Sequence, residues 1–221
     1  MLRLHHFPLC PFCRKVRLVL HEKEQQPELE TVEPWLQQRE LAALNPAAEV
    51  PVLEDGDRVI CDSWAICEYL DETRPEPALL GKSLLERAEI RRLVAWFDVK
   101  FSREVTDLVW REKVIRRLKA TGTPNSAAVR AGLANIHAHL EYIGFLYEQR
   151  NWLAGEALSL ADIAAAAQLS VLDYLGDVPW ERHPGAKLWY ARIKSRPSFR
   201  PLLQDRLPGL KPAPPYDDLD F

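Results

Sequence analysis

The spacing of apolar and polar positions divides the chain into two unlike parts. In the first part, short apolar or alternating runs predict strands. These runs are 1–7, 29–32, 50–53 and 58–60. Helical spacing follows Pro11, Gln37 and Asp62-Ser63, and Pro11 suits a first helical turn because its missing N–H costs nothing there. The order strand, helix, strand, helix, strand, strand, helix predicts a thioredoxin-like α/β domain over residues 1–75.

The second part has helical spacing throughout. We place the linker at the proline-containing residues 74–84 and an all-α bundle over residues 85–210. Ala127–Gln149 is a long amphipathic stretch, and Ser159–Asp162 has the form of a capping box. The segment Ile163–Leu172 carries almost no charge, so we expect that helix at the centre of the bundle.

The last eleven residues, 211–221, change character. They hold three prolines and three acids, which leaves no room for a packed element. We expect this tail to be extended and mobile except where it docks. Tyr216 to Phe221 interleaves aromatic and acidic residues and has the composition of a docking peptide. The partner-binding candidates in it are Asp217, Asp218, Leu219, Asp220 and Phe221.

Composition limits the classes of function. The chain has 221 residues, 47% of them apolar, and a net charge of −3, which disfavours a general nucleic-acid binder. No apolar run reaches the roughly 18 residues of a membrane span, and the N-terminus lacks a secretory pattern, so we expect a cytoplasmic protein. Residues 1–80 carry eight Lys and Arg against 15 Asp and Glu, whereas residues 81–221 carry 21 against 17.

All four cysteines lie in the first 70 residues, and Cys10 and Cys13 form a C-x-x-C pair at a helix start. The helix dipole favours a thiolate at Cys10, with Arg14 and Lys15 adding positive charge and Cys13 placed to resolve a mixed disulfide. The alternative is that both cysteines are small, buried, inert side chains. The cysteine and histidine spacings form no metal-ligand set, so we expect no metal.

Two further features are candidates for binding a partner. The stretch 110–119 is rich in Lys and Arg, and it is either a solvated helix face or a landing site for an acidic partner. Its candidate residues are Arg111, Lys113, Arg116 and Arg117. Trp35 follows Pro34 in a predicted loop, where it either packs in a core or anchors a partner.

Four pieces of this sequence together resemble the glutathione S-transferase superfamily over about residues 1–205. They are Cys10-Pro11-Phe12-Cys13, Asn45-Pro46 followed by Val50-Pro51-Val52-Leu53, Asp62-Ser63, and Ser159-Leu160-Ala161-Asp162. The resemblance implies that fold, a cis bond before Pro51, and a homodimer that packs one subunit's sheet domain on the other's helical domain. It also implies that Cys10 attacks, that Val50 and Pro51 clamp glutathione, and that Asp62 and Ser63 hold its γ-glutamyl end. From the residues alone, Asp62 and Ser63 are equally well a plain helix cap.

Glu49 departs from the family pattern. Many glutathione-binding members carry Lys or Gln just before the Val-Pro pair, whereas an acid here repels an anionic tripeptide. Arg39 is a candidate to compensate this charge. Glutathione is therefore a candidate ligand rather than a required cofactor.

A narrower resemblance is to an alphaproteobacterial branch of the superfamily that binds filaments of the bacterial tubulin homologue FtsZ during constriction. It is carried by His5-His6, Arg14–Leu18, Glu49–Leu53, Trp96-Phe97-Asp98 and Asp218–Phe221. Two hypotheses follow. The first is a division factor at the division site, with little or no glutathione turnover, that binds FtsZ filaments through Trp35, the basic stretch and the tail. The second is a glutathione-dependent thiol transferase or reductase that uses Cys10.

Overall fold

The computed structural model describes residues 1–219, apart from the side chain of Pro215. Its N-terminal part is a four-stranded mixed sheet in the order β2-β1-β3-β4, with β1 parallel to β2 and antiparallel to β3. The strands are β1 (Leu2–His6), β2 (Glu28–Thr31), β3 (Val52–Asp55) and β4 (Arg58–Cys61). The helices are α1 (Pro11–Glu22), α2 (Gln38–Leu44) and α3 (Ser63–Thr73). This is the predicted thioredoxin-like arrangement, and each element lies within a few residues of its predicted position.

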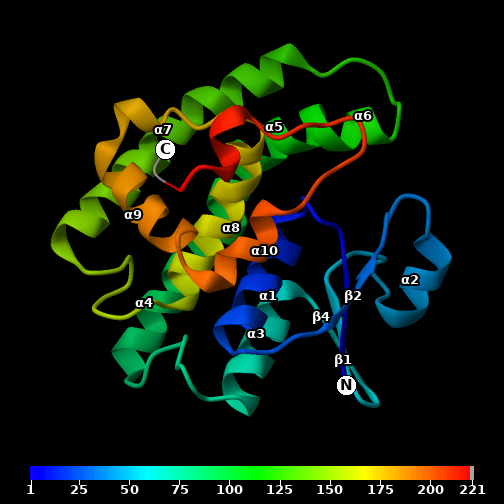
Figure 1. The fold of residues 1–221 in the computed structure, drawn as a ribbon, viewed down its shortest axis with the longest axis horizontal. Coiled ribbons are helices and arrows are strands. Elements are labelled where there is room, and N and C mark those ends of the chain that lie inside the picture. Colours follow the sequence, from blue (N-terminus) through cyan, green and yellow to red (C-terminus); the bar gives the residue numbers. More distant parts are fainter. Residues whose placement is uncertain (220–221) are drawn as a thin grey trace.

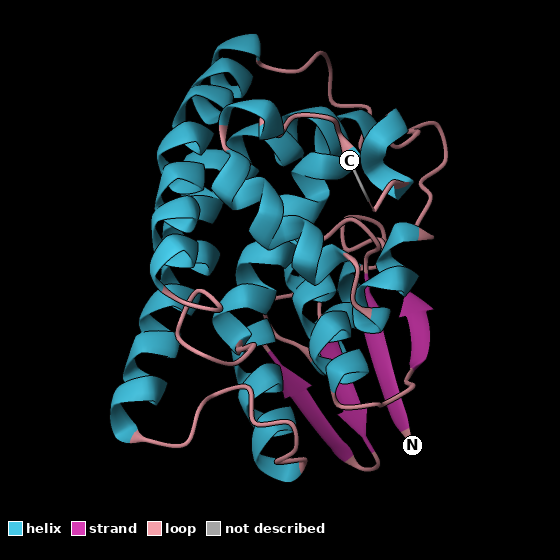
Figure 2. Ribbon diagram, turned by 60° about the vertical axis from the view of Figure 1, so that its left-hand side comes forward, coloured by secondary structure: helices cyan, strands magenta, loops and turns pink. Residues whose placement is uncertain are grey.

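The remaining chain is helical, and Figure 2 shows the helices gathered on one side of the sheet. From Leu84 to Leu118 the helix is continuous and includes π-helical stretches at Trp96–Thr106 and Arg111–Ile115. Its α-helical parts are α4 (Leu84–Ala95), α5 (Asp107–Trp110) and α6 (Arg116–Leu118). The later helices are α7 (Ser126–Gln149), α8 (Leu160–Tyr174), α9 (Pro184–Lys194) and α10 (Arg200–Leu203). Short 3₁₀ turns lie at Trp180–Arg182, Pro197–Phe199 and Pro214–Asp217.

Helix α8 forms the centre of the helical part, as its lack of charge predicts. Every residue from Leu160 to Tyr174 is buried. The capping box at its start is present: the Asp162 carboxylate accepts from the backbone N–H of Ser159 at 3.1 Å and from the Ser159 hydroxyl at 3.0 Å. Asp162 also accepts from the backbone N–H of Leu153 and from the Trp189 indole. This buried carboxylate therefore fixes α8 against both the preceding loop and α9.

Helix α1 lies between the sheet and α8, close to the middle of the molecule (Figure 1). Arg14, Lys15 and Arg17 give this helix a polar face, and all three are buried, with exposed fractions of 0, 1 and 3%. They are buried because this face meets the helical domain. Arg14 and Arg17 pair with Asp205 at 3.0 and 2.8 Å, and Lys15 pairs with Asp98.

Candidate functional site

The turn between β1 and α1 positions Cys10 at the start of the helix. The Cys10 N–H donates to the Phe7 carbonyl at 2.9 Å, and Cys10 is the N-cap residue with Pro11 directly after it. The N–H of Phe7 donates to the Cys13 sulfur at 3.4 Å. Cys10 is 6% exposed and Cys13 is fully buried. The predicted placement of Cys10 is confirmed, with a thiol that reaches solvent only narrowly.

The two thiols have opposite acidities. A hydrogen bond from the Cys13 thiol holds the pKa of Cys10 below its usual value, and the backbone N–H groups of Cys13 and Phe12 act in the same direction. Burial raises the pKa of Cys13 well above its usual value. Cys10 is therefore the more acidic thiol of the pair, and Cys13 is its hydrogen-bond donor. The expected support from Arg14 and Lys15 is largely taken up by their carboxylate partners, Asp205 and Asp98.

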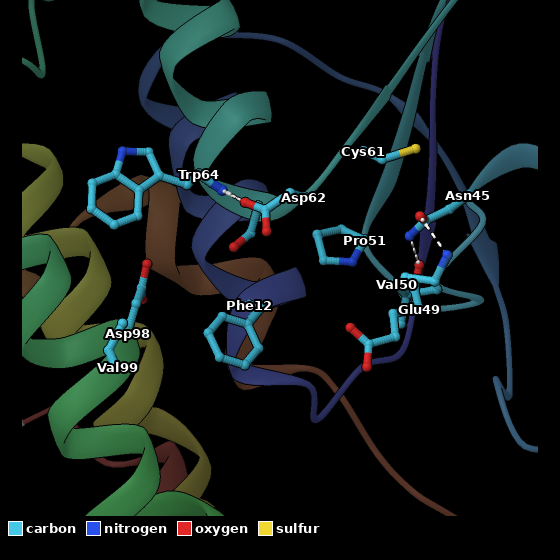
Figure 3. Close-up of a pocket in the computed structure, with 12 residues that line it drawn as sticks. Phe12, Asn45, Glu49, Val50, Pro51, Cys61, Asp62, Trp64, Asp98 and Val99 are labelled. Atoms are coloured by element: carbon cyan, nitrogen blue, oxygen red, sulfur yellow. Dashed lines mark hydrogen bonds between the residues drawn. The ribbon is translucent and has the colours of Figure 1, made fainter.

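The Val50–Pro51 bond is cis, as the family resemblance implies, and it borders a cavity of about 350 Å³ that we call the cis-proline pocket (Figure 3). Asp62, at the start of α3, accepts from the Trp64 N–H at 2.7 Å and points into the space in front of Pro51. Phe12 forms another wall. The lining residues are Phe12, Asn45, Ala47, Glu49, Val50, Pro51, Cys61, Asp62, Ser63, Trp64, Asp98 and Val99.

This lining brings together four of the five residues predicted to hold glutathione. Val50, Pro51, Asp62 and Ser63 all line the cis-proline pocket, whereas Arg39 is exposed on α2 and lies outside the lining. The charged lining residues described are all acids: Glu49, Asp62 and Asp98. Burial raises the pKa of Asp98, an effect that the ammonium of Lys15 opposes. Arg39 therefore does not supply the compensating cation that Glu49 requires for an anionic tripeptide.

A second cavity of about 360 Å³, the aromatic cleft, lies on the other side of Phe12 and Val50. Its walls include Phe7, Cys10, Phe12, Trp35 and Trp110, and the cations at it are Arg111 and Lys119. The Phe7 and Trp35 rings meet edge to face with centroids 5.3 Å apart. The sequence predicts Trp35 and Arg111 as partner-binding residues for separate reasons. The structure places both in the wall of this cleft.

The basic stretch carries less unpaired positive charge than its sequence indicates, because three of its cations have carboxylate partners. Arg111 pairs with Asp107 at 2.8 Å, Lys113 with Asp177 at 2.5 Å, and Arg116 with Glu112 at 2.7 Å. Arg117 lines a groove of about 690 Å³ that also holds Lys113 and Lys211. Figure 1 shows the segment after α10 running past α6 before it turns back toward α7, and Leu210 and Lys211 of this segment line the groove.

The C-terminal tail is anchored by Tyr216, contrary to the expectation of an extended, mobile segment. The ring is fully buried, 5.1 Å from the Tyr174 ring between centroids, and its hydroxyl donates to the Leu202 carbonyl at 2.9 Å. The Ala213 N–H donates to the Tyr174 carbonyl at 2.8 Å, and Asp217 pairs with Arg206 at 2.7 Å. The buried Tyr216 ring therefore holds in place a proline-rich segment that forms no long helix or strand of its own. The predicted partner residues Asp220 and Phe221 lie outside the described residues.

Sequence reasoning missed Trp110, Lys119 and Phe7 as parts of the aromatic cleft. Lys119 and Trp110 belong to the basic stretch. Its many Lys and Arg residues indicate a charged surface and give no sign that the Trp110 indole lines a cleft. The Trp110 Nε1–H is buried without a hydrogen-bond partner among the described residues. An unsatisfied indole beside two cations is the signal that marks this cleft, and it exists only in three dimensions.

None of the helices described in residues 1–219 is long and apolar enough to cross a membrane. Over the same residues, no group of three or more His, Cys, Asp or Glu side chains is placed to hold a metal ion.

Comparisons with known proteins place the chain in a family. The profile "Glutathione S-transferase, N-terminal domain" matches residues 4–78, and "Glutathione S-transferase, C-terminal domain" matches residues 112–197. The chain is 51% identical to FtsZ-localized protein A of Caulobacter vibrioides, over 99% of this chain and 97% of that protein.

Solved structures agree with this placement. A crystal structure of a glutathione S-transferase from Rhodospirillum rubrum F11 is 54% identical with a TM-score of 0.98 and covers 100% of both chains. The structure described as FzlA from C. crescentus is 51% identical with a TM-score of 0.96 and covers 100% of this chain and 99% of that one. These matches and the observed thioredoxin-like and helical domains confirm the fold predicted from the four sequence pieces. The chain belongs to the glutathione S-transferase family.

Proposed function

We propose that this protein is a cell-division factor that binds FtsZ filaments and works at the division site with little or no glutathione turnover. The observation that carries the proposal is the meeting of Trp35, Arg111 and Lys119 at the aromatic cleft, in a chain 51% identical over its length to FtsZ-localized protein A. Trp and Arg are enriched among the residues that dominate binding energy, and basic side chains favour an acidic partner.

The proposed surface is continuous across the two domains. Trp35 and the cations of the cleft lie at one end, and the groove of Lys113, Arg117 and Lys211 lies beside the C-terminal segment. The burial of Tyr216 fixes the chain after this groove, and Asp217 pairs there with Arg206. The surface therefore combines basic side chains with an acidic terminus, which suits a partner that carries both an acidic and a basic patch.

Co-sedimentation with preformed FtsZ polymers tests the proposal. We expect the wild-type chain to pellet with polymers, and Trp35→Ala and Asp218→Lys to weaken binding at least tenfold, because one removes the anchor and the other reverses a tail charge. Phe145→Ala is the matched control, since Phe145 is a 54% exposed aromatic on α7 and lines neither cavity. Equal binding by all four proteins would overturn the proposed surface, and no pelleting by the wild type would overturn the partner.

A thiol transferase or reductase is the second candidate, favoured by the lowered pKa of Cys10 and its position in the wall of the aromatic cleft. The low exposure of Cys10 and the acids of the cis-proline pocket weigh against glutathione as its co-substrate. A single variant distinguishes the division factor from the thiol transferase. Cys10→Ser leaves FtsZ binding unchanged if the protein is a division factor, and abolishes thiol–disulfide exchange if it is an enzyme.

We also propose that the protein forms a homodimer in which one subunit's sheet domain packs on the other's helical domain. Val59 on β4 and Val99 on the π-helical stretch are apolar side chains that are 45% and 56% exposed, one on each domain. Light scattering at micromolar concentration tests this proposal. A particle of twice the 25.4 kDa chain mass is the expected result, and a particle of the chain mass excludes the dimer.

A further inference from the structure

One buried side chain, Arg14, connects the C-terminal tail to the turn that leads into α1. Its Nε donates to the Pro8 carbonyl at 2.8 Å, and its Nη1 donates to the carbonyl and the hydroxyl of Ser170 at 3.2 and 3.0 Å. Its Nη2 donates to the Leu202 carbonyl at 3.5 Å and to the Asp205 carboxylate at 3.0 Å. Because a guanidinium is planar and its donors have fixed directions, a shift at one of these partners is passed to the others.

Tyr216 of the tail packs on this guanidinium. The Cζ atom of Arg14 lies 5.9 Å from the centroid of the Tyr216 ring, whose face attracts a cation. The Tyr216 hydroxyl donates at 2.9 Å to the Leu202 carbonyl, the acceptor that Arg14 also uses. Both side chains are 0% exposed. The position of Arg14 therefore depends on whether the ring is in place beside it.

The other end of this connection is the wall of the aromatic cleft. Pro8 lies in the turn between Phe7 and Cys10, which closes with a hydrogen bond from the Cys10 N–H to the Phe7 carbonyl at 2.9 Å. Phe7 and Cys10 both line the cleft, and the Phe7 ring meets the Trp35 ring edge to face at 5.3 Å between centroids. The bond from Arg14 to Pro8 therefore holds the part of the wall that supports Trp35.

The tail is held mainly at one point. Among the residues of 211–219 that the structure describes, Tyr216 is the one that is buried. The prolines of this segment have no backbone N–H to donate. A partner that binds the tail can thus release it by displacing a single ring, without separating the helices beneath.

We propose that Arg14 couples the tail to the aromatic cleft: a buried Tyr216 holds the turn before α1, and a partner that releases Tyr216 loosens that turn and changes the cleft around Cys10 and Trp35. As regulation of FtsZ binding, this coupling rests on the proposed function, and it makes the tail and Trp35 one cooperative surface. Coupling of this kind is reciprocal, so a partner bound at Trp35 also changes how firmly the tail is held.

Alkylation of Cys10 in the full-length protein tests the coupling without FtsZ. Iodoacetamide labelling is followed by tandem mass spectrometry, at a pH high enough that the rate no longer rises with pH and reports access to the thiol. We expect Tyr216→Ala to label Cys10 at least about fivefold faster than the wild type, because the loosened turn opens more often. Tyr216→Leu, which keeps an apolar group in the buried site, is the milder second variant and should label at an intermediate rate.

Ile143→Ala is the matched control for lost stability. Ile143 is a fully buried side chain of α7 that lines neither the cis-proline pocket nor the aromatic cleft. We expect its Cys10 to label at the wild-type rate. Cys67, which is 1% exposed, reports global unfolding and should stay unlabelled in every variant. An unchanged Cys10 rate in both Tyr216 variants, or an equal increase in Ile143→Ala, would overturn the proposal.

A double-mutant comparison tests whether Arg14 is the link. Arg14→Lys keeps a positive charge near Asp205 but has a single donor group, which cannot span Pro8 and Leu202 together. We expect Arg14→Lys to speed Cys10 labelling as Tyr216→Ala does, and the double variant to be no faster than either. If the two increases multiply, the coupling does not pass through Arg14. Failure of wild-type co-sedimentation with FtsZ, by contrast, would overturn the proposed partner and leave these labelling results unaffected.

Discussion

The ammonium of Lys119 lies 6.0 Å from the centroid of the Trp35 ring, linking the end of α6 to the loop before α2. The aromatic cleft is thus shared between the two domains, and a partner seated on Trp35 also meets the cations of the helical domain. The cis-proline pocket differs from this cleft in its charged residues, which are all acids. Four residues line both cavities: Phe12, Ala47, Glu49 and Val50. The start of α1 therefore adjoins an aromatic opening that holds both cations and carboxylates, and a neighbouring cavity whose charged lining residues are acids.

The Lys15–Asp98 pair makes a prediction about stability. Its side chains are 1% and 8% exposed, so Asp98→Ala leaves a buried ammonium unpaired. Breaking such a pair costs about 3–5 kcal/mol of the free energy of unfolding. Replacing both residues, with Lys15→Met and Asp98→Leu, should recover most of that loss because neither charge remains buried. Urea denaturation followed by tryptophan fluorescence measures both. A single variant that loses less than about 1 kcal/mol contradicts the buried-pair account.

His6 gives the protein a pH dependence. Burial and the neighbouring Arg17 lower its pKa to about 4, against about 6.5 in the unfolded chain. Between these values the unfolded chain binds more protons, so stability falls as pH falls. From pH 7.5 to pH 5 the wild type should lose about 2 kcal/mol relative to His6→Gln. Denaturation curves at the two pH values test this difference, and the comparison with the variant removes the contribution of other groups. Parallel loss in both proteins would show that His6 is not the cause.

Tyr216 predicts how firmly the tail is held. Tyr216→Ala removes a fully buried ring and should cost about 3–5 kcal/mol, as for other large aromatic truncations. Tyr216→Phe removes only the hydrogen bond to Leu202 and should cost about 1 kcal/mol. Carboxypeptidase digestion followed by mass spectrometry should proceed past residue 213 in the alanine variant and stop before it in the phenylalanine variant. Identical digestion of both would show that the ring does not anchor the tail.

The thiol pair makes a chemical prediction. Because the Cys13 thiol donates to Cys10, Cys13→Ala should raise the pKa of Cys10 and slow its alkylation at pH 7 several-fold. The rate of iodoacetamide labelling against pH, followed by peptide mapping, gives the pKa directly. Cys67 is an internal control, because burial raises its pKa to about 12 and it should remain unlabelled in the folded protein. An unchanged Cys10 profile in Cys13→Ala would exclude the hydrogen bond as the cause of its acidity.

Much of the fold follows from local sequence signals. The strands and the capping box at Ser159–Asp162 depend on residues close in sequence, and each lies close to its predicted position. The burial of α1's polar face depends on carboxylates that are distant in the chain: Asp98 for Lys15, and Asp205 for Arg14 and Arg17. The spacing of polar residues along α1 identifies its polar face. It does not show that distant carboxylates of the helical domain cover that face.

The candidate site shows the same division. The cis bond at Pro51 follows from the family resemblance and the cap at Asp62 from the residues alone, and the structure places both at one pocket. The grouping of Trp35 with Trp110 and Lys119 requires the docking of two domains, and no local pattern contains it. Arg39 fails as the partner of Glu49 because α2 carries it on an exposed surface outside the lining.

The buried cations of α1 bear on how this chain can be recombined with its relatives. Family profiles recognise its two halves separately, as though they were exchangeable modules. Here Arg14, Lys15 and Arg17 belong to the first matched region, whereas their carboxylates at Asp98 and Asp205 lie in the helical part of the chain, outside both matched regions. A chimaera that takes the first half alone inherits three buried positive charges with no counterions. Successful domain exchange, in evolution or in the laboratory, must therefore carry residues 98 and 205 along with α1.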